Sequence, residues 1–148
     1  MEASAPSRVL VVAHKTAATP SLIEAVRERA ARGPCTFTLL VPNTVHGFER
    51  VMDPEDAAQT EAAAVLDLAL PLLREAAAGA PVEGRIGVAE PLAAVQDAVN
   101  LGGFDEVIVS TLSRRVSRWL KLDLPSKITG LGLPVTTVTA DEKVAAGH

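Results

Sequence analysis

The sequence is poor in several kinds of residue, and each shortage argues against a class of structure. It contains one cysteine, Cys35, so an internal disulfide is impossible. Aromatic residues make up 3% of the chain and tyrosine is absent, which argues against platforms that stack nucleic-acid bases or sugars. No apolar run approaches the ~18 residues that cross a bilayer. The first residues also lack the basic and apolar regions of a secretory signal, so we expect a cytoplasmic protein with no membrane partner.

Positive charge is also in short supply. Lys and Arg number 14 against 18 Asp and Glu, which gives a formal net charge of −4. Proteins that wrap nucleic acid are normally basic, so we expect no nucleic-acid partner. Hydrophobic residues make up 48% of the chain and charged residues 22%, a composition typical of globular proteins. The length predicts a single domain over residues 8–140, with a flexible arm at 1–7 and a flexible tail at 141–148.

The familiar catalytic motifs are missing. The sequence has no G-x-S-x-G, no H-E-x-x-H, no Walker A motif and no G-x-G-x-x-G after its first predicted strand. His46 has no Cys, His or carboxylate partner at a metal-binding spacing, so no metal site is predicted. Cys35 has no basic neighbour in sequence and is expected to be a small buried hydrophobe. We therefore expect a protein without catalysis of its own.

Apolar and β-branched segments alternate with helical patterns along the chain. Strands are predicted over residues 8–13, 35–41, 82–88, 104–110 and 134–139. Helix starts are predicted where a capping residue precedes a proline, at Thr19-Pro20, Asp53-Pro54 and Glu90-Pro91. Pro71 predicts a kink or break in the second helix, and a broken helical segment is expected before the last strand. Crossover helices between strands indicate an α/β fold with a doubly wound parallel sheet.

In such sheets ligands bind beyond the carboxyl ends of the strands, where the strand order reverses. Two segments would lie there, one after the first strand and one after the fourth. The candidate ligand-binding residues, which we call the crevice residues, are His14, Lys15, Thr16, Ser110, Thr111, Ser113, Arg114 and Arg115.

Three features carry a resemblance to a known family. The order and lengths of the elements fit, Ala89-Glu90-Pro91 looks like the family's turn into its third helix, and a basic loop precedes the Leu133-Pro134-Val135 strand. On these grounds the chain resembles the universal stress proteins over about residues 8–139. The resemblance implies a three-layer Rossmann-like fold with strand order 3-2-1-4-5 and a link to the stress response. It also implies a homodimer paired through the last strand, and two branches, of which one binds ATP.

The ATP-binding branch carries a motif of three glycines that this chain lacks. Laid onto this sequence, the glycine positions fall on Ser110, Ser113 and Asp123, with Leu124 as the residue that follows. The aspartate that the family places after its first strand is also absent, and His14 or Lys15 stands there. Asp123 is expected to cap a short helix, where its carboxylate would repel a phosphate and occupy the helix donors. The resemblance therefore favours the branch that does not bind ATP, and no cofactor is expected.

Several alternatives stay open. The leading interpretation is a binding or regulatory module. A second is a nucleotide- or phosphate-binding protein that uses the crevice residues, and a third is a slow phosphate hydrolase with His14 as acid or base. The basic stretch from Ser113 to Lys121 suits either an anion site, for a phosphorylated ligand or an acidic partner, or a solvated face.

The last predicted strand bears on assembly. Residues Val135 to Thr139 are rich in β-branched side chains and uncharged, so an open edge there would invite pairing with a second copy. Trp119 is expected to pack onto the sheet or into that dimer interface.

Overall fold

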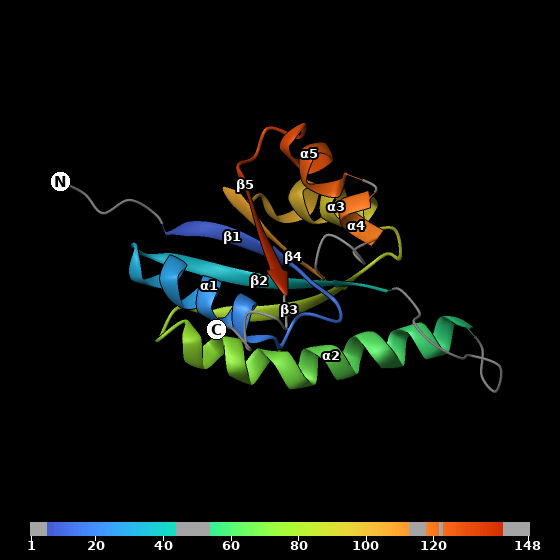
Figure 1. Cartoon of the computed structure of the whole chain (residues 1–148), viewed down its shortest axis with the longest axis horizontal. Coiled ribbons are helices and arrows are strands. Elements are labelled where there is room, and N and C mark those ends of the chain that lie inside the picture. The colour runs from blue at the N-terminus through green and yellow to red at the C-terminus, as the bar shows by residue number, and fades with distance from the viewer. Residues whose placement is uncertain (1–5, 44–53, 113–117, 122, 141–148) are drawn as a thin grey trace.

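Five parallel strands form one sheet, in a computed structural model that describes residues 6–43, 54–112, 118–121 and 123–140. The order is β3-β2-β1-β4-β5, as predicted (Figure 1). The strands are β1 (Ser7–Val12), β2 (Cys35–Pro42), β3 (Val82–Gly87), β4 (Glu106–Leu112) and β5 (Val135–Ala140). The predicted arm and tail lie largely outside the described residues, at 1–5 and 141–148.

Helices cover both faces of the sheet and make three layers (Figure 1). One face carries α1 (Pro20–Ala31) and α2 (Pro54–Ala76). The other carries α3 (Pro91–Gly102) and the two short helices α4 (Arg118–Lys121) and α5 (Leu124–Thr129). The short helices correspond to the broken segment expected from the sequence.

The central strand β1 explains why the two layers hold together. Val9 and Val11 belong to the core cluster under α1 and α2, whereas Leu10 and Val12 belong to the cluster under α3 and α5. All four side chains are fully buried. A continuous apolar run is what a strand needs when helices cover both of its faces.

The helices α1 and α3 each begin at a proline, as the sequence predicts. At α3 the Glu90 side chain accepts a hydrogen bond from the Ala93 amide at 2.8 Å, which satisfies a free donor of the first turn. At α1 the expected cap bond is absent. The Thr19 hydroxyl instead donates to the Thr16 carbonyl at 2.8 Å, so it secures the preceding loop rather than the helix.

Two details differ from the prediction. The helix α2 continues through Pro71, so the break, one of the two predicted outcomes, is wrong; Pro71 is exposed, and water can solvate the carbonyl group that the proline leaves free. The strand β4 begins at Glu106, two residues later than predicted. Asp105, just before β4, makes two hydrogen bonds to Arg8. Its amide donates to the Arg8 carbonyl, and its carboxylate accepts from the Arg8 amide at 2.8 Å.

Candidate functional site

The carboxyl ends of β1 and β4 lie side by side, because these strands are paired with Val12 opposite Val109 (Figure 1). This is the point where the strand order reverses. Among the described residues, four of the six buried polar side chains follow or end these two strands: His14, Thr16, Ser110 and Thr111, each at most 5% exposed. Buried polar groups are costly unless they are hydrogen-bonded, so their concentration at one edge singles it out as the candidate site.

A hydrogen bond between two side chains ties the edges of the site together. The hydroxyls of Thr16 and Ser110 are 2.6 Å apart, and either atom can donate. Thr16 is held in turn by the Thr19 side chain, which donates to its carbonyl. The loop after β1 is thereby fixed to the end of β4. The sequence singled out both residues but gave no reason to expect them to bond to each other.

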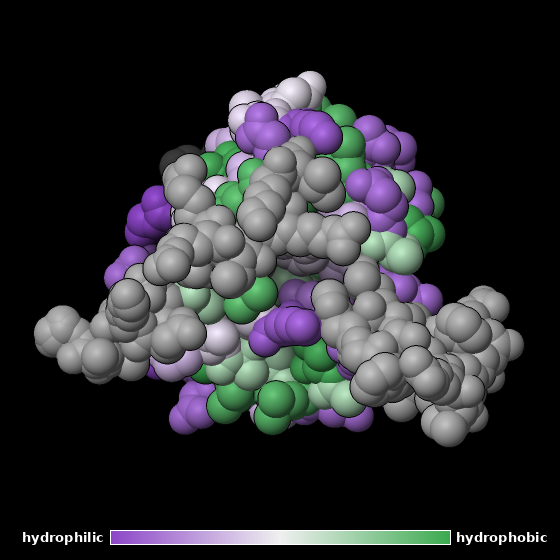
Figure 2. Space-filling view, turned by 45° about the vertical axis from the view of Figure 1, so that its right-hand side comes forward, coloured by the Kyte–Doolittle hydropathy of each residue, from purple (hydrophilic) through white to green (hydrophobic). Residues whose placement is uncertain are grey.

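The remaining crevice residues are of three kinds. Thr111 donates its hydroxyl hydrogen to the neighbouring Leu112 carbonyl at 2.9 Å, so it is engaged within its own strand. Lys15 is exposed. Ser113, Arg114 and Arg115 lie outside the described residues. Figure 2 turns this end of the sheet toward the reader and shows hydrophilic and hydrophobic residues together between the segments drawn in grey.

Asp123 differs from expectation in one respect. It occupies the N-cap position of α5, as predicted, but its side chain makes no capping hydrogen bond. Its backbone is left-handed, with φ 60° and ψ 40°, whereas a capping residue normally has an extended backbone. The carboxylate therefore does not occupy the helix donors, and that part of the argument against phosphate is wrong. The left-handed conformation is one that glycine adopts without strain, at the position where the ATP motif has its third glycine.

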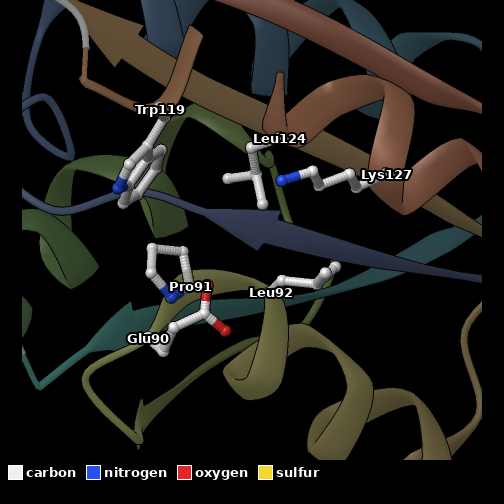
Figure 3. Close-up of a pocket in the computed structure, with 6 residues that line it drawn as sticks. All are labelled: Glu90, Pro91, Leu92, Trp119, Leu124 and Lys127. Atoms are coloured by element: carbon white, nitrogen blue, oxygen red, sulfur yellow. The ribbon is translucent and has the colours of Figure 1, made fainter. Parts of the chain in front are cut away.

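A separate small pocket lies between the start of α3 and the short helices (Figure 3). Glu90, Pro91 and Leu92 lie on one side, and Trp119, Leu124 and Lys127 on the other. Its volume is about 40 Å³, which is enough for a few atoms and excludes a nucleotide. Trp119 packs against the core cluster of this face, which includes Leu124 and Ile128.

The opposite end of the sheet holds a partly buried ion pair. Arg29 of α1 contacts Glu106 of β4 with an N–O distance of 2.9 Å. The hydrogen bond to Glu106 raises the pKa of Arg29, so the guanidinium stays charged. Cys35 is 4% exposed, as a buried hydrophobe should be, and burial raises the pKa of its thiol. The ion pair joins α1 to β4, so we interpret this end of the sheet as structural.

Two classes of site are absent from the part of the chain that the structure describes. There is no group of three or more His, Cys, Asp or Glu side chains that could hold a metal ion. Among the same residues, no helix has the length and apolar character that a membrane crossing requires.

Comparison with known proteins gives a likeness in structure. No protein-family model matches the sequence, and no curated protein matches it. A universal stress protein from Archaeoglobus fulgidus superposes with a TM-score of 0.61 at 18% identity, over 89% of this chain and 93% of that one. The universal stress protein from the same organism in complex with dAMP gives 0.58 at 19% identity, over 90% and 98%.

A universal stress protein family member from Burkholderia pseudomallei gives a TM-score of 0.58 at 16% identity, over 88% of this chain and 94% of that one. At these identities the likeness concerns the fold alone. The order of the five parallel strands and the flanking helices agree with it. The chain therefore shares the fold of the universal stress proteins.

Proposed function

We propose that this chain is a binding or regulatory module of the universal stress protein type, without catalysis of its own, and that it does not hold ATP through a glycine loop. The observation that carries the proposal is the buried polar cluster where β1 and β4 end, closed by the Thr16–Ser110 hydrogen bond. Open α/β sheets bind ligands at this point. The fold shared with universal stress proteins supports the same interpretation.

The residues at the motif positions argue against ATP. A glycine loop binds phosphates through backbone N–H groups that no side chain shields. Here Ser110 has a side chain whose hydroxyl is already bonded to Thr16. Asp123 adds a carboxylate whose charge would repel a triphosphate, even though its side chain leaves the helix donors free.

A second candidate is the binding of a nucleotide or another small phosphorylated molecule through side chains of the crevice residues. The structural likeness to a universal stress protein in complex with dAMP favours it. Hydroxyls and an imidazole can contact a phosphate or a ribose without glycines, and Lys15 supplies an exposed cation next to them. Such a ligand would have to displace the Thr16–Ser110 bond or bind over it.

Two measurements test these proposals. Mass spectrometry of whatever the purified, denatured protein releases identifies a co-purified ligand, and calorimetry with ATP, AMP, dAMP and cyclic nucleotides measures affinity. We expect no ATP binding at micromolar concentration. Binding of ATP in that range would overturn the leading proposal, and binding of AMP or dAMP alone would establish the second candidate. If none of these nucleotides binds, the search turns to protein partners.

Variants separate the contributions. Replacing Thr16 by Val removes the 2.6 Å hydroxyl bond at nearly constant volume, and should weaken a crevice ligand by up to about tenfold if Thr16 also contacts it. Asp123→Gly should gain no ATP affinity if the missing glycines at Ser110 and Ser113 decide the matter. Phosphate turnover that disappears in His14→Ala would instead establish the hydrolase.

A further inference from the structure

We propose that the pocket between α3 and the short helices is a binding site for a short-chain organic carboxylate, such as propionate. Its walls are mainly apolar, formed by Leu92, Trp119 and Leu124, with Pro91 beside them (Figure 3). A volume of about 40 Å³ exceeds the ~10–15 Å³ that one water molecule needs, so it suits a group the size of a methyl or ethyl. The apolar end of the ligand would lie on these walls.

The charge of the pocket selects the other end of the ligand. Among the described residues that line it, Lys127 is the one with a positive charge; the residue is exposed, and Figure 3 shows its ammonium group beside Leu124. Within the part of the chain that the structure describes, Lys127 makes no ion pair. An ammonium beside an apolar wall is the arrangement that binds a carboxylate through a charge-assisted hydrogen bond.

Glu90 also lines the pocket, and its negative charge must be accounted for. Its carboxylate accepts the Ala93 amide hydrogen at 2.8 Å and lies at the start of α3, where the helix dipole stabilises negative charge. This engagement reduces the repulsion that a bound carboxylate meets without abolishing it. Glu90 therefore makes a second, independent variant informative, because neutralising it should strengthen the site.

The site differs from the crevice in both residues and ligand. None of its six lining residues is a crevice residue, and a carboxylate with one or two apolar carbons is far smaller than a nucleotide. The inference thus goes beyond the proposed function, and the nucleotide titrations do not decide it.

Trp119 makes the test direct because it is the only tryptophan in the chain and lines the pocket. The full chain is titrated with sodium propionate at constant ionic strength, balanced with sodium chloride. Indole fluorescence and the NMR signal of the indole N–H are followed together. We expect saturable changes in both, with a dissociation constant of order millimolar, given the few atoms of the ligand. Propionamide, which has the same shape without the charge, should bind at least about tenfold more weakly.

Four variants complete the test. Lys127→Met, which keeps the apolar stem, should weaken propionate by about tenfold, and Lys127→Arg should restore binding. Glu90→Gln retains an acceptor for the Ala93 amide and should strengthen binding by a few-fold. Arg32→Met removes an exposed cation at the end of α1 and should change nothing. Responses that do not saturate, or equal affinity of Lys127→Met and the natural protein, would overturn the proposal.

Discussion

At the amino end of the sheet, the buried thiol of Cys35 lies close to a partly buried ion pair. Cys35 begins β2, and Arg29 and Glu106 form their ion pair near enough to influence the thiol. Burial raises the pKa of Cys35 above its ordinary value of 9.0, while the positive charge of Arg29 acts in the opposite direction with a smaller effect. The protonated thiol is therefore the form that the folded protein favours.

This preference predicts a loss of stability in alkali. Above pH 9.0, the ordinary pKa of the thiol, the unfolded chain releases the Cys35 proton more readily than the folded protein does. The contribution of the neutral thiol is thus fully present below this pH and is lost as pH rises through the higher pKa of the folded state. Urea unfolding of the natural protein and of Cys35→Ala, from pH ~7.5 to ~10.5, measures this contribution to the free energy of unfolding.

The absence of tyrosine makes the comparison clean, since no phenol titrates in the same range. Cys35→Ala should lose about 1 kcal/mol at neutral pH by removing a buried group, and this deficit should shrink as pH rises. A difference between the two proteins that stays constant across the range would contradict the prediction.

The candidate site shows which residue properties a sequence reveals. Polarity and a position at or just after the end of a predicted strand were enough to select His14, Thr16, Ser110 and Thr111, all of which the structure places at the predicted edge. Their near-complete burial could not be predicted, because polar residues in loops and at strand ends are usually exposed. Nor could the Thr16–Ser110 bond, which joins residues 94 positions apart. Asp123 has the predicted position but a left-handed backbone, which its residue type allows without requiring it.

Among the elements, the end of α2 contains a residue in an unfavourable conformation. The helix ends at Ala76, and Ala78 follows with φ 53°, in the left-handed region where a Cβ atom is crowded. Glycine is the usual residue at such a helix end. The chain therefore contains alanine where its backbone favours glycine.

Replacing Ala78 by Gly should raise the free energy of unfolding by about 1 kcal/mol, because the strain of the left-handed alanine disappears. Ala64→Gly provides a matched control. Ala64 is an exposed alanine within the same helix, and glycine there should lower the free energy of unfolding by about 1 kcal/mol. Denaturant unfolding measures the change in the free energy of unfolding for each variant. Two losses of similar size would show that Ala78 is not strained.

Element order was predictable and element ends were less so, for physical reasons that particular residues show. Proline after a capping residue located the start of α3, because the geometry of the first turn is local. The tolerance of α2 for Pro71 depends on which side of the helix faces solvent, which is set by packing with the sheet. The extension of β4 to Leu112 depends on its partner, since Thr111 and Leu112 pair with Thr139 and Ala140 of β5.

For the molecule as a whole, the two edges of the sheet differ in character. At one edge β3 carries Glu83 and Arg85 together with Gly84 and Gly87, and charges and glycines discourage pairing with another strand. At the other edge β5 has the sequence VTTVTA, without charge or glycine. Thr136 and Thr137 are exposed. This asymmetry favours β5 as the edge through which two copies would pair.

We therefore expect a homodimer through β5. Light scattering of the full chain at micromolar concentration should give twice the mass of 15.4 kDa. Lysine at both Thr136 and Thr137 should shift the equilibrium to monomer, because charge on an edge strand opposes pairing. The same double substitution to lysine at Glu83 and Arg85 of β3 should leave the dimer intact. A monomeric natural protein would rule out the β5 dimer.

The placement of β1 at the centre of the sheet also has a consequence for synthesis. The Arg8 amide of β1 donates to the carboxylate of Asp105, which directly precedes β4 and lies 97 residues further along the chain. While the ribosome is still making the intervening chain, β1 and β2 can pair, yet the other edge of β1 has no partner. One edge of this apolar strand then keeps unpaired backbone groups until β4 has been synthesised. Such late closure slows folding and leaves the nascent chain open to aggregation, so the first two-thirds of this protein are its most vulnerable part during translation.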